Sequence, residues 1–299
     1  MGKLSELLNS RKLVLLDSAM GTELDKRGLS TQIPLWSSKA LIDDPDSIRQ
    51  IHIDNIDAGA EIITTNTFRT QRRIFKKANY KLKEFGFGET AFELTKEAVE
   101  IAQEAVLVTN ENVLVAGCIA PLEDCYEPNL EIDESIYSSE HYEHIKNLFE
   151  SGVDCFLAET MNSIKEIQCV LEQIKKFDKE YMISLSCINE EKLLSGEKLG
   201  DAIAEIEKHS PSAILVNCIH PSKAEPILSA MKSMTDKPLG CYANVGDEKL
   251  FDEGKFEIDI NAEQYFSFAK KWKQLGVKII GGCCGTSPEY IHKLASLKS

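Results

Sequence analysis

The sequence predicts an α/β fold, a (β/α)₈ TIM barrel, because eight short apolar runs alternate with helical patterns. Such alternation implies parallel strands joined by right-handed crossovers, and eight units favour a closed barrel over an open sheet. The length of 299 residues is ordinary for this barrel, which typically needs about 250. No composition shift or low-complexity segment marks a boundary, so we expect residues 1–299 to form a single domain.

Each predicted strand is a short apolar run that ends at a polar residue or a turn. The strands cover 13–16, 61–65, 113–117, 154–158, 181–186, 213–217, 238–242 and 277–280. Helices are expected over 44–56, 89–106, 140–152, from 163 onward and over 262–275, whereas the acidic segment 121–139 is expected to be a long loop. Gly59, Gly152 and Gly276 each precede a strand, where glycine can end a helix in the left-handed conformation.

Composition argues against several classes of protein. The formal net charge is −14, whereas nucleic-acid binding normally uses a basic patch. The cluster of Arg72, Arg73, Lys76 and Lys77 is expected to form a solvated helix face. The chain shows no apolar leader and no run of 18 apolar residues, so we expect it to be neither secreted nor membrane-bound. Its nine cysteines are then expected to be reduced thiols in the cytoplasm.

The polar residues at the strand ends are the candidate site, because the active site of this fold lies at the C-terminal ends of the strands. No glycine-rich dinucleotide loop or P-loop pattern occurs, which weakens the nucleotide-binding alternatives. The strand-end residues are Asp17, Thr65, Asn66, Cys118, Glu159, Ser186, Cys218, Asn244, Cys283 and Cys284.

Cys283 and Cys284 lie among the glycines of segment 281–286, directly after the last predicted strand. Adjacent side chains of an extended strand point to opposite faces, so both thiols reach one ion only if the chain turns, as glycine permits. Cys218 can supply a third ligand, and a zinc site of three cysteines keeps its fourth position open, as catalytic sites do. The alternatives are inert buried cysteines, a vicinal disulfide in a redox protein, or a closed structural site completed by His220.

The donor set predicts a particular kind of zinc chemistry. Three thiolates give the centre a net charge of about −1, which makes it a weak Lewis acid. It suits the binding of a substrate thiol as its thiolate, because a free thiol with a pKa of about 8.5 is mostly protonated at neutral pH. The sequence therefore predicts alkyl transfer to a thiol rather than hydrolysis.

Asp17 and Glu159 are the candidates for binding the rest of the substrate. A carboxylate at a strand end can hold an ammonium group, and the backbone N–H groups around residues 19–21 can hold a carboxylate. The alternatives are structural: Asp17 as a turn or cap residue, and Glu159 as a cap for the helix that starts near Ser163.

With these residues identified, the chain resembles the homocysteine S-methyltransferase family over essentially its whole length. Five segments carry the resemblance, namely 15–22, 63–68, 158–160, 216–218 and 281–286, and the last two are the specific ones. The resemblance implies methyl transfer from an activated donor to the homocysteine thiol by in-line displacement, giving methionine. It implies that homocysteine is bound to zinc through sulfur, and the implied residues are Cys218, Cys283 and Cys284 for zinc, Asp17 and Glu159 for the amino-acid end, and Met20 and Gly21 along the substrate.

The methyl donor is less clearly indicated. Residues 242–246 resemble the strand-seven loop of the S-methylmethionine and folate-type members rather than that of the betaine enzymes, and Asn244 in this loop is a predicted substrate-binding residue. We therefore favour a sulfonium donor, S-methylmethionine or S-adenosylmethionine. One alternative is a homocysteine-side subunit that takes methyl from a corrinoid or folate partner protein, toward which segment 65–68 leans. A non-catalytic zinc or thiol sensor on the same barrel is an alternative from another class.

Overall fold

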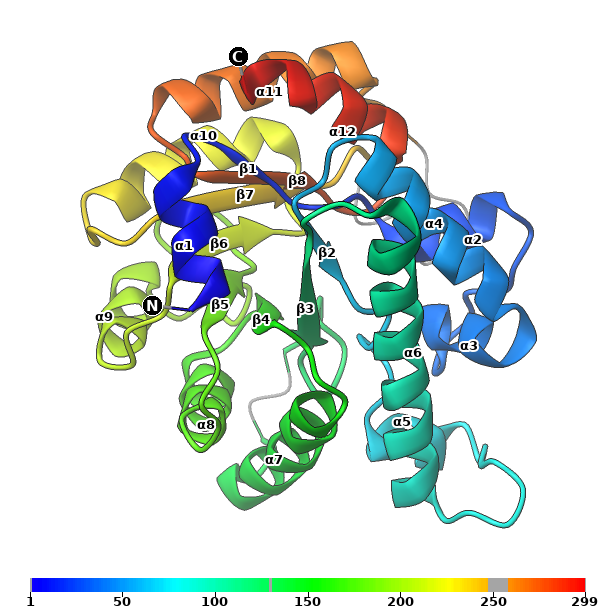
Figure 1. Ribbon diagram of the computed structural model, residues 1–299. Coiled ribbons are helices and arrows are strands. Elements are labelled where there is room, and N and C mark those ends of the chain that lie inside the picture. The colour runs from blue at the N-terminus through cyan, green and yellow to red at the C-terminus, as the bar shows by residue number, and fades with distance from the viewer. Residues whose placement is uncertain (1, 129–130, 247–257, 299) are drawn as a thin grey trace.

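The computed structural model describes residues 2–128, 131–246 and 258–298. Its strands form one parallel sheet in the order β1-β8-β7-β6-β5-β4-β3-β2, and a parallel bridge between Leu16 and Ile62 joins β1 to β2. The sheet is therefore closed, and Figure 1 shows the helices around it. The predicted (β/α)₈ barrel is confirmed. The strands are β1 (Val14–Leu15), β2 (Ile62–Thr64), β3 (Leu114–Ile119), β4 (Cys155–Met161), β5 (Tyr181–Leu185), β6 (Ala213–Asn217), β7 (Leu239–Ala243) and β8 (Ile279–Gly282).

The helices follow the strands and supply the outer layer. They are α1 (Lys3–Ser10), α2 (Met20–Lys26), α3 (Ala40–Asp43), α4 (Pro45–Asp57), α5 (Arg72–Lys77), α6 (Phe87–Thr109), α7 (Glu134–Glu150), α8 (Ile164–Ile174), α9 (Leu199–Glu207), α10 (Pro221–Lys232), α11 (Ala262–Gln274) and α12 (Pro288–Ala295), with 3₁₀ turns η1 (Trp36–Lys39) and η3 (Ser296–Lys298). None of the helices in the described part of the chain is both long enough and apolar enough to cross a membrane.

Local signals explain most of the helix boundaries. Asp44 caps α4 by accepting the N–H of Ser47, and Gly59, Gly152 and Gly276 have φ values of 106°, 87° and 93° at the predicted junctions. The predicted loop 121–139 is too long at its C-terminal end. Helix α7 begins at Glu134 rather than near residue 140, because Asp133 caps it by accepting the N–H of Ser135. Of the segment 243–261, residues 247–257 lie outside the described part.

The alternation of side chains along the strands separates two cores. One face of the strands packs against the outer helices, and the other fills the barrel interior, where Val14 and Leu16 belong to one cluster with residues from the seven other strands. Leu4 and Leu8 of α1 belong to the interior cluster. Helix α1 therefore closes the N-terminal end of the barrel, where the N–H of Leu4 donates to Glu180 just before β5. The candidate site lies at the opposite end of the barrel, where the strands have their C-terminal ends.

Candidate active site

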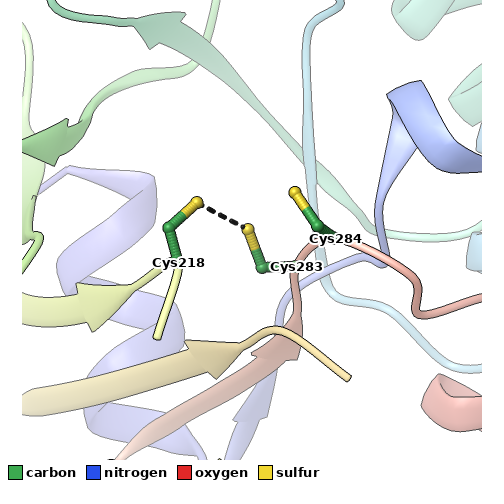
Figure 2. Close-up of side chains that lie close together, drawn as sticks. All are labelled: Cys218, Cys283 and Cys284. Carbon is green, nitrogen blue, oxygen red and sulfur yellow. Dashed lines mark hydrogen bonds between the residues drawn. The ribbon is translucent and has the colours of Figure 1, made fainter. Parts of the chain in front are cut away.

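Three cysteine side chains converge at the C-terminal ends of β6 and β8, as Figure 2 shows. Cys218 directly follows β6, and Cys283 and Cys284 directly follow β8. Their sulfur atoms all lie within 4.8 Å of one another, and Cys218 Sγ is 3.1 Å from Cys283 Sγ. In the part of the chain that the structure describes, no other three potential metal ligands form such a group. The structure thus brings together the three predicted ligands, whose role as ligands stays a prediction.

The glycines that precede the cysteine pair allow close packing rather than a turn. A Cβ atom on Gly281 would lie 2.7 Å from Leu16 Cβ, and one on Gly282 would lie 2.3 Å from Thr286 Oγ1. Positive φ occurs instead at Gly285, at 83°. The glycine conformation expected at this turn is therefore supplied by Gly285, after the pair, and not by Gly281 or Gly282. They end strand β8 and let it approach β1 and Thr286.

Hydrogen bonds from two other segments hold the turn that carries the cysteine pair. Thr286 Oγ1 donates to the Cys283 carbonyl at 2.6 Å and accepts from the N–H of Ala19 at 3.2 Å. The N–H of Val245 donates to the Cys284 carbonyl at 3.0 Å. The turn is therefore tied both to the start of α2 and to the segment after β7. Sequence analysis missed this role of Thr286, although the residue lies within the cysteine motif.

The geometry of the three sulfur atoms fits a zinc ion. Zinc–thiolate bonds of about 2.3 Å in a tetrahedral arrangement place the sulfur atoms about 3.8 Å apart, and these sulfur atoms lie within 4.8 Å of one another. Without a cation the thiols hold their protons, because a hydrogen bond with Cys283 and burial together raise the pKa of Cys218. A bound cation favours the thiolate, so metal binding would release protons from this cluster.

His220 does not complete a closed site, which corrects that alternative. Its Nδ1 lies 2.7 Å from Ser222 Oγ and caps α10, while its Nε2 lies 3.4 Å from Asp259 Oδ2. Both ring nitrogens are thus occupied away from the sulfur atoms. Cys283 and Cys284 are free thiols rather than a vicinal disulfide. Among the described residues, the cluster therefore brings together three candidate metal ligands without a fourth.

Glu159 of β4 connects β3 and β7 across the barrel mouth. Cys118 Sγ donates to Glu159 Oε1 at 2.7 Å, and the Tyr242 hydroxyl donates to Oε2 at 3.2 Å. The first N–H of α8, on Ile164, donates to Glu197 instead. The alternative of Glu159 as a helix cap is therefore wrong. Burial raises the pKa of Glu159 because its charge loses solvation, so a cationic group entering the site would favour its ionised form.

Asp17 is buried at the end of β1. Its carboxyl group accepts hydrogen bonds from the N–H of Thr64 at 2.7 Å and from Thr64 Oγ1 at 3.0 Å, so it links the end of β1 to the end of β2, a contact different from the turn or cap given as the alternative. Burial nevertheless raises the pKa of Asp17 to about 8, although the hydrogen bonds from Thr64 lower it. The charge of Glu159 adds to the rise. Two neighbouring carboxyl groups with raised pKa values are typical of a site that receives a positive group.

Met20 and Gly21 begin α2 beside the cysteine turn. A Cβ atom on Gly21 would lie 2.6 Å from the Trp36 ring, so the packing of this ring requires glycine here. Met20 is half-buried and packs against the apolar cluster beneath α2. The N–H of Ala19 is already donated to Thr286, which removes it from the backbone groups predicted to hold a carboxylate. The substrate roles of Met20 and Gly21 stay predictions.

Three buried side chains at strand ends offer hydrogen bonds that the described residues do not use. Asn244 is fully buried after β7, and both polar atoms of its amide lack a partner, as do Ser18 Oγ and Ser186 Oγ. The backbone N–H of Asn244 donates to the carbonyl of Ile219, next to Cys218. Because buried polar atoms normally find partners, we expect these atoms to contact a bound ligand or water.

The loop after β3 adds two residues that sequence analysis did not single out. Burial raises the pKa of Tyr126, and the charges of Cys218 and Cys284 raise it further, so this ring lies near the cysteines. Burial also raises the pKa of Cys125 to about 12. No motif marks either residue, and their position depends on how the loop folds back over the barrel.

Comparison with known proteins agrees with this fold. The family profile described as homocysteine S-methyltransferase matches residues 14–297. Homocysteine S-methyltransferase YbgG of Bacillus subtilis is 28% identical over 307 residues, covering 99% of this chain and 98% of its own. The homocysteine S-methyltransferase of Escherichia coli is 28% identical over 301 residues, covering 97% of each chain. The metallated form of MmuM from Escherichia coli superposes with a TM-score of 0.86 at 25% identity, covering 98% of this chain and 99% of that one.

The fold, the cysteine cluster and these matches define the class of protein, a thiol methyltransferase built on a (β/α)₈ barrel. The chain belongs to the homocysteine S-methyltransferase family.

The raised pKa of Asp17 gives a prediction for pH dependence. Below a pKa of about 8 the carboxyl group carries a proton. If Asp17 binds the ammonium group of homocysteine, as the resemblance implies, it must lose this proton to form the ion pair. Homocysteine affinity should therefore rise with pH up to about 8, by as much as about tenfold per pH unit for this one proton. Calorimetric titration from pH 6 to 9 measures this slope for wild type and Asp17→Asn. In Asp17→Asn the slope of log affinity against pH should be smaller by about one proton, and the slope that remains should be the part due to the substrate thiol. Equal slopes would contradict the assignment.

Proposed function

We propose that the protein moves a methyl group from a sulfonium donor to the thiol of homocysteine, giving methionine, with zinc held by Cys218, Cys283 and Cys284. The observation that carries the proposal is the convergence of these three sulfur atoms from the ends of β6 and β8, on either side of β7, in a chain of this family. The relative from Escherichia coli is described in a metallated form, which supports a metal ion in this protein.

The proposed reaction is an in-line displacement between two sulfur atoms. When bound, the zinc ion would hold the homocysteine sulfur as a thiolate at neutral pH. A lone pair of this sulfur forms a bond to the methyl carbon while the bond from that carbon to the sulfonium sulfur breaks, and the thiol proton leaves to solvent. The protein contributes mainly by holding the two sulfur atoms in line with the methyl group.

The carboxyl groups of the site are suited to the amino-acid end of homocysteine. We assign Glu159 and Asp17 to its ammonium group, because Asp17 is buried, Glu159 lies partly buried near it, and neither forms an ion pair with a described lysine or arginine. Met20 and Gly21 would lie along the same substrate. Asn244 would bond to one of its polar groups, because the amide of Asn244 is buried without a partner in the described residues.

An aromatic surface beside the site supports a cationic donor. The Trp36 ring packs on Gly21 and meets the Phe68 ring edge to face, with 5.3 Å between ring centroids. Aromatic faces attract cations such as a sulfonium group. The guanidinium of Arg69 lies 5.5 Å from the Phe68 centroid, and its charge opposes the rise in the Cys125 pKa that burial causes. We assign this surface to a sulfonium amino acid, the class of S-methylmethionine and S-adenosylmethionine.

Arg69 stands apart from the other arginines. No carboxylate among the described residues pairs with it, and its guanidinium donates one hydrogen bond to the Glu123 carbonyl at 3.2 Å. All the other arginines form ion pairs with carboxylates, namely Arg11, Arg27, Arg49, Arg72 and Arg73. Arg69 is therefore free to bind the carboxylate of the donor.

The carrier-protein alternative receives less support from the same region. Segment 65–68 slightly resembles the family members that take methyl from a corrinoid or folate partner protein. In this structure, however, Asn66 Nδ2 donates to the Ser37 carbonyl and Thr67 Oγ1 donates to the Cys118 carbonyl. These side chains hold neighbouring loops in place and are not available to a partner. The free cysteines fit a reducing compartment, and we propose the cytoplasm as the location.

Methionine formation by reduced, zinc-loaded protein tests the proposed reaction. Homocysteine would be supplied with S-methylmethionine, S-adenosylmethionine, betaine or methyltetrahydrofolate in turn, and we expect turnover with a sulfonium donor. Cys218→Ala should lose zinc and lower the rate at least ~100-fold while keeping its helical circular dichroism, whereas the control Cys155→Ala should keep its zinc. Zinc and homocysteine binding without turnover on any donor would contradict the proposal and favour a carrier protein or a sensor. Full zinc occupancy in Cys218→Ala would show that Cys218 is not a zinc ligand.

Substitution of Arg69 tests the donor assignment. Arg69→Gln should raise the KM for S-methylmethionine about tenfold or more, because a charge-assisted hydrogen bond to the donor carboxylate is lost. Homocysteine affinity and zinc content should stay unchanged. Arg72→Gln is the matched control, since Arg72 pairs with Glu143 on the outer surface. Trimethylsulfonium, which has no carboxylate, should be used equally by wild type and Arg69→Gln. An unchanged KM for S-methylmethionine in Arg69→Gln would contradict the assignment.

A further inference from the structure

The side chain of Asn217 is a hydrogen-bonding centre directly beneath the cysteine cluster. It is the last residue of β6, immediately before Cys218, and is fully buried. Asn217 Oδ1 accepts from the N–H of Thr160 at 3.0 Å and from Ser184 Oγ at 2.7 Å. Asn217 Nδ2 donates to Thr160 Oγ1 at 2.9 Å and to Cys218 Sγ at 3.4 Å. The amide therefore uses both of its N–H groups and both acceptor positions.

The partners of this amide fix which way it points. The backbone N–H of Thr160 can only donate, so the atom of Asn217 that faces it must be the oxygen. The NH₂ group then faces Cys218 Sγ, and the opposite orientation would place two donors against each other. Thr160 Oγ1 also lies 3.9 Å from the same sulfur. The sulfur of Cys218 thus accepts an N–H from Asn217 and lies close to the hydroxyl of Thr160.

Both residues joined by Asn217 have unusual backbone conformations. Cys218 has φ of 52° and Thr160 has φ of 59°, in the left-handed region that L-residues other than glycine rarely adopt and that a β-branched residue particularly disfavours. Thr160 lies where the register of β4 against β5 shifts, between Ala158 and Met161. Irregularities of this kind redirect side chains near active sites. Asn217 therefore connects the irregular part of β4, which carries Glu159, to the start of the cysteine cluster.

We propose that Asn217 is a positioning residue that donates an N–H to the Cys218 thiolate and holds Cys218 and Thr160 in their left-handed conformations. The role rests on the proposed function, in which Cys218 is a metal ligand. Partners of this kind orient metal ligands and adjust the electron density on them. An N–H donated to sulfur takes up part of the negative charge that three thiolates place on the centre, and it fixes the direction of the Cys218 side chain.

Cobalt(II) is the probe for this role, because it occupies zinc sites and its thiolate charge-transfer absorption reports directly on the metal–sulfur bonds. Asn217→Asp keeps the size of the side chain and the acceptors for Thr160 and Ser184, but it places oxygen against the Cys218 sulfur. We expect Asn217→Asp to bind Co²⁺ at least about tenfold more weakly than wild type, with a shifted charge-transfer band, because a carboxylate repels a thiolate. Ser184→Ala is the matched control. It removes a hydrogen bond from the same amide without touching the sulfur, and it should leave the band in place with affinity within about twofold of wild type.

The outcomes separate this inference from the proposed reaction. An Asn217→Asp variant with wild-type affinity and spectrum would overturn the inference, as would an equal change in Ser184→Ala. Absence of Co²⁺ binding by wild type would overturn both the inference and the metal site. Normal three-thiolate absorption in wild type without methyl transfer to homocysteine would overturn the proposed reaction alone. If Asn217→Asp does not fold, Thr160→Val takes its place, and an unchanged band in that variant would count against the inference.

Discussion

The meeting of three thiols depends on the parallel register that closes the barrel. Asn217 of β6 pairs with Tyr242 of β7, and Tyr242 pairs with Gly281 of β8, so these three residues lie at one level across adjacent strands. Cys218 and Cys283 therefore leave the sheet at nearly the same height, with one strand between them. Strand β1 pairs with β8 on one side, and the bridge between Leu16 and Ile62 joins it to β2 on the other. The residues of the site are distant in sequence, and this register makes them neighbours.

The electrostatics of the mouth follow from the same arrangement. Asp17, Glu159, Cys118 and the cysteine trio are acidic or potentially acidic groups, and burial contributes to raising the pKa of each of them. A buried site rich in such groups favours ligands that bring positive charge. A divalent metal, an ammonium group and a sulfonium group all do so. The proposed cofactor, acceptor and donor therefore share one electrostatic reason for binding here.

The sequence predicted the barrel and its strand ends because both arise from local patterns. Apolar runs, helix-ending glycines and the rule that sites lie at C-terminal strand ends were enough to bring Cys218 together with Cys283 and Cys284. What the sequence missed depends on contacts between distant segments: the role of Gly282 in making room for Thr286, the bonds of Asn217 to Thr160, and the Trp36 ring over Gly21. Helix α7 began earlier than expected because a capping aspartate outweighed the acidic, proline-containing sequence before it.

The central claim is that three thiolates of this chain hold zinc and leave one position for the sulfur of homocysteine. X-ray absorption at the zinc edge tests this claim directly, because it counts the sulfur atoms bound to the metal. The account predicts about three sulfur atoms at about 2.3 Å in the zinc-loaded protein, with one lighter atom, and about four once homocysteine is added. Four sulfur atoms before homocysteine is added, or an unchanged spectrum afterwards, would contradict it.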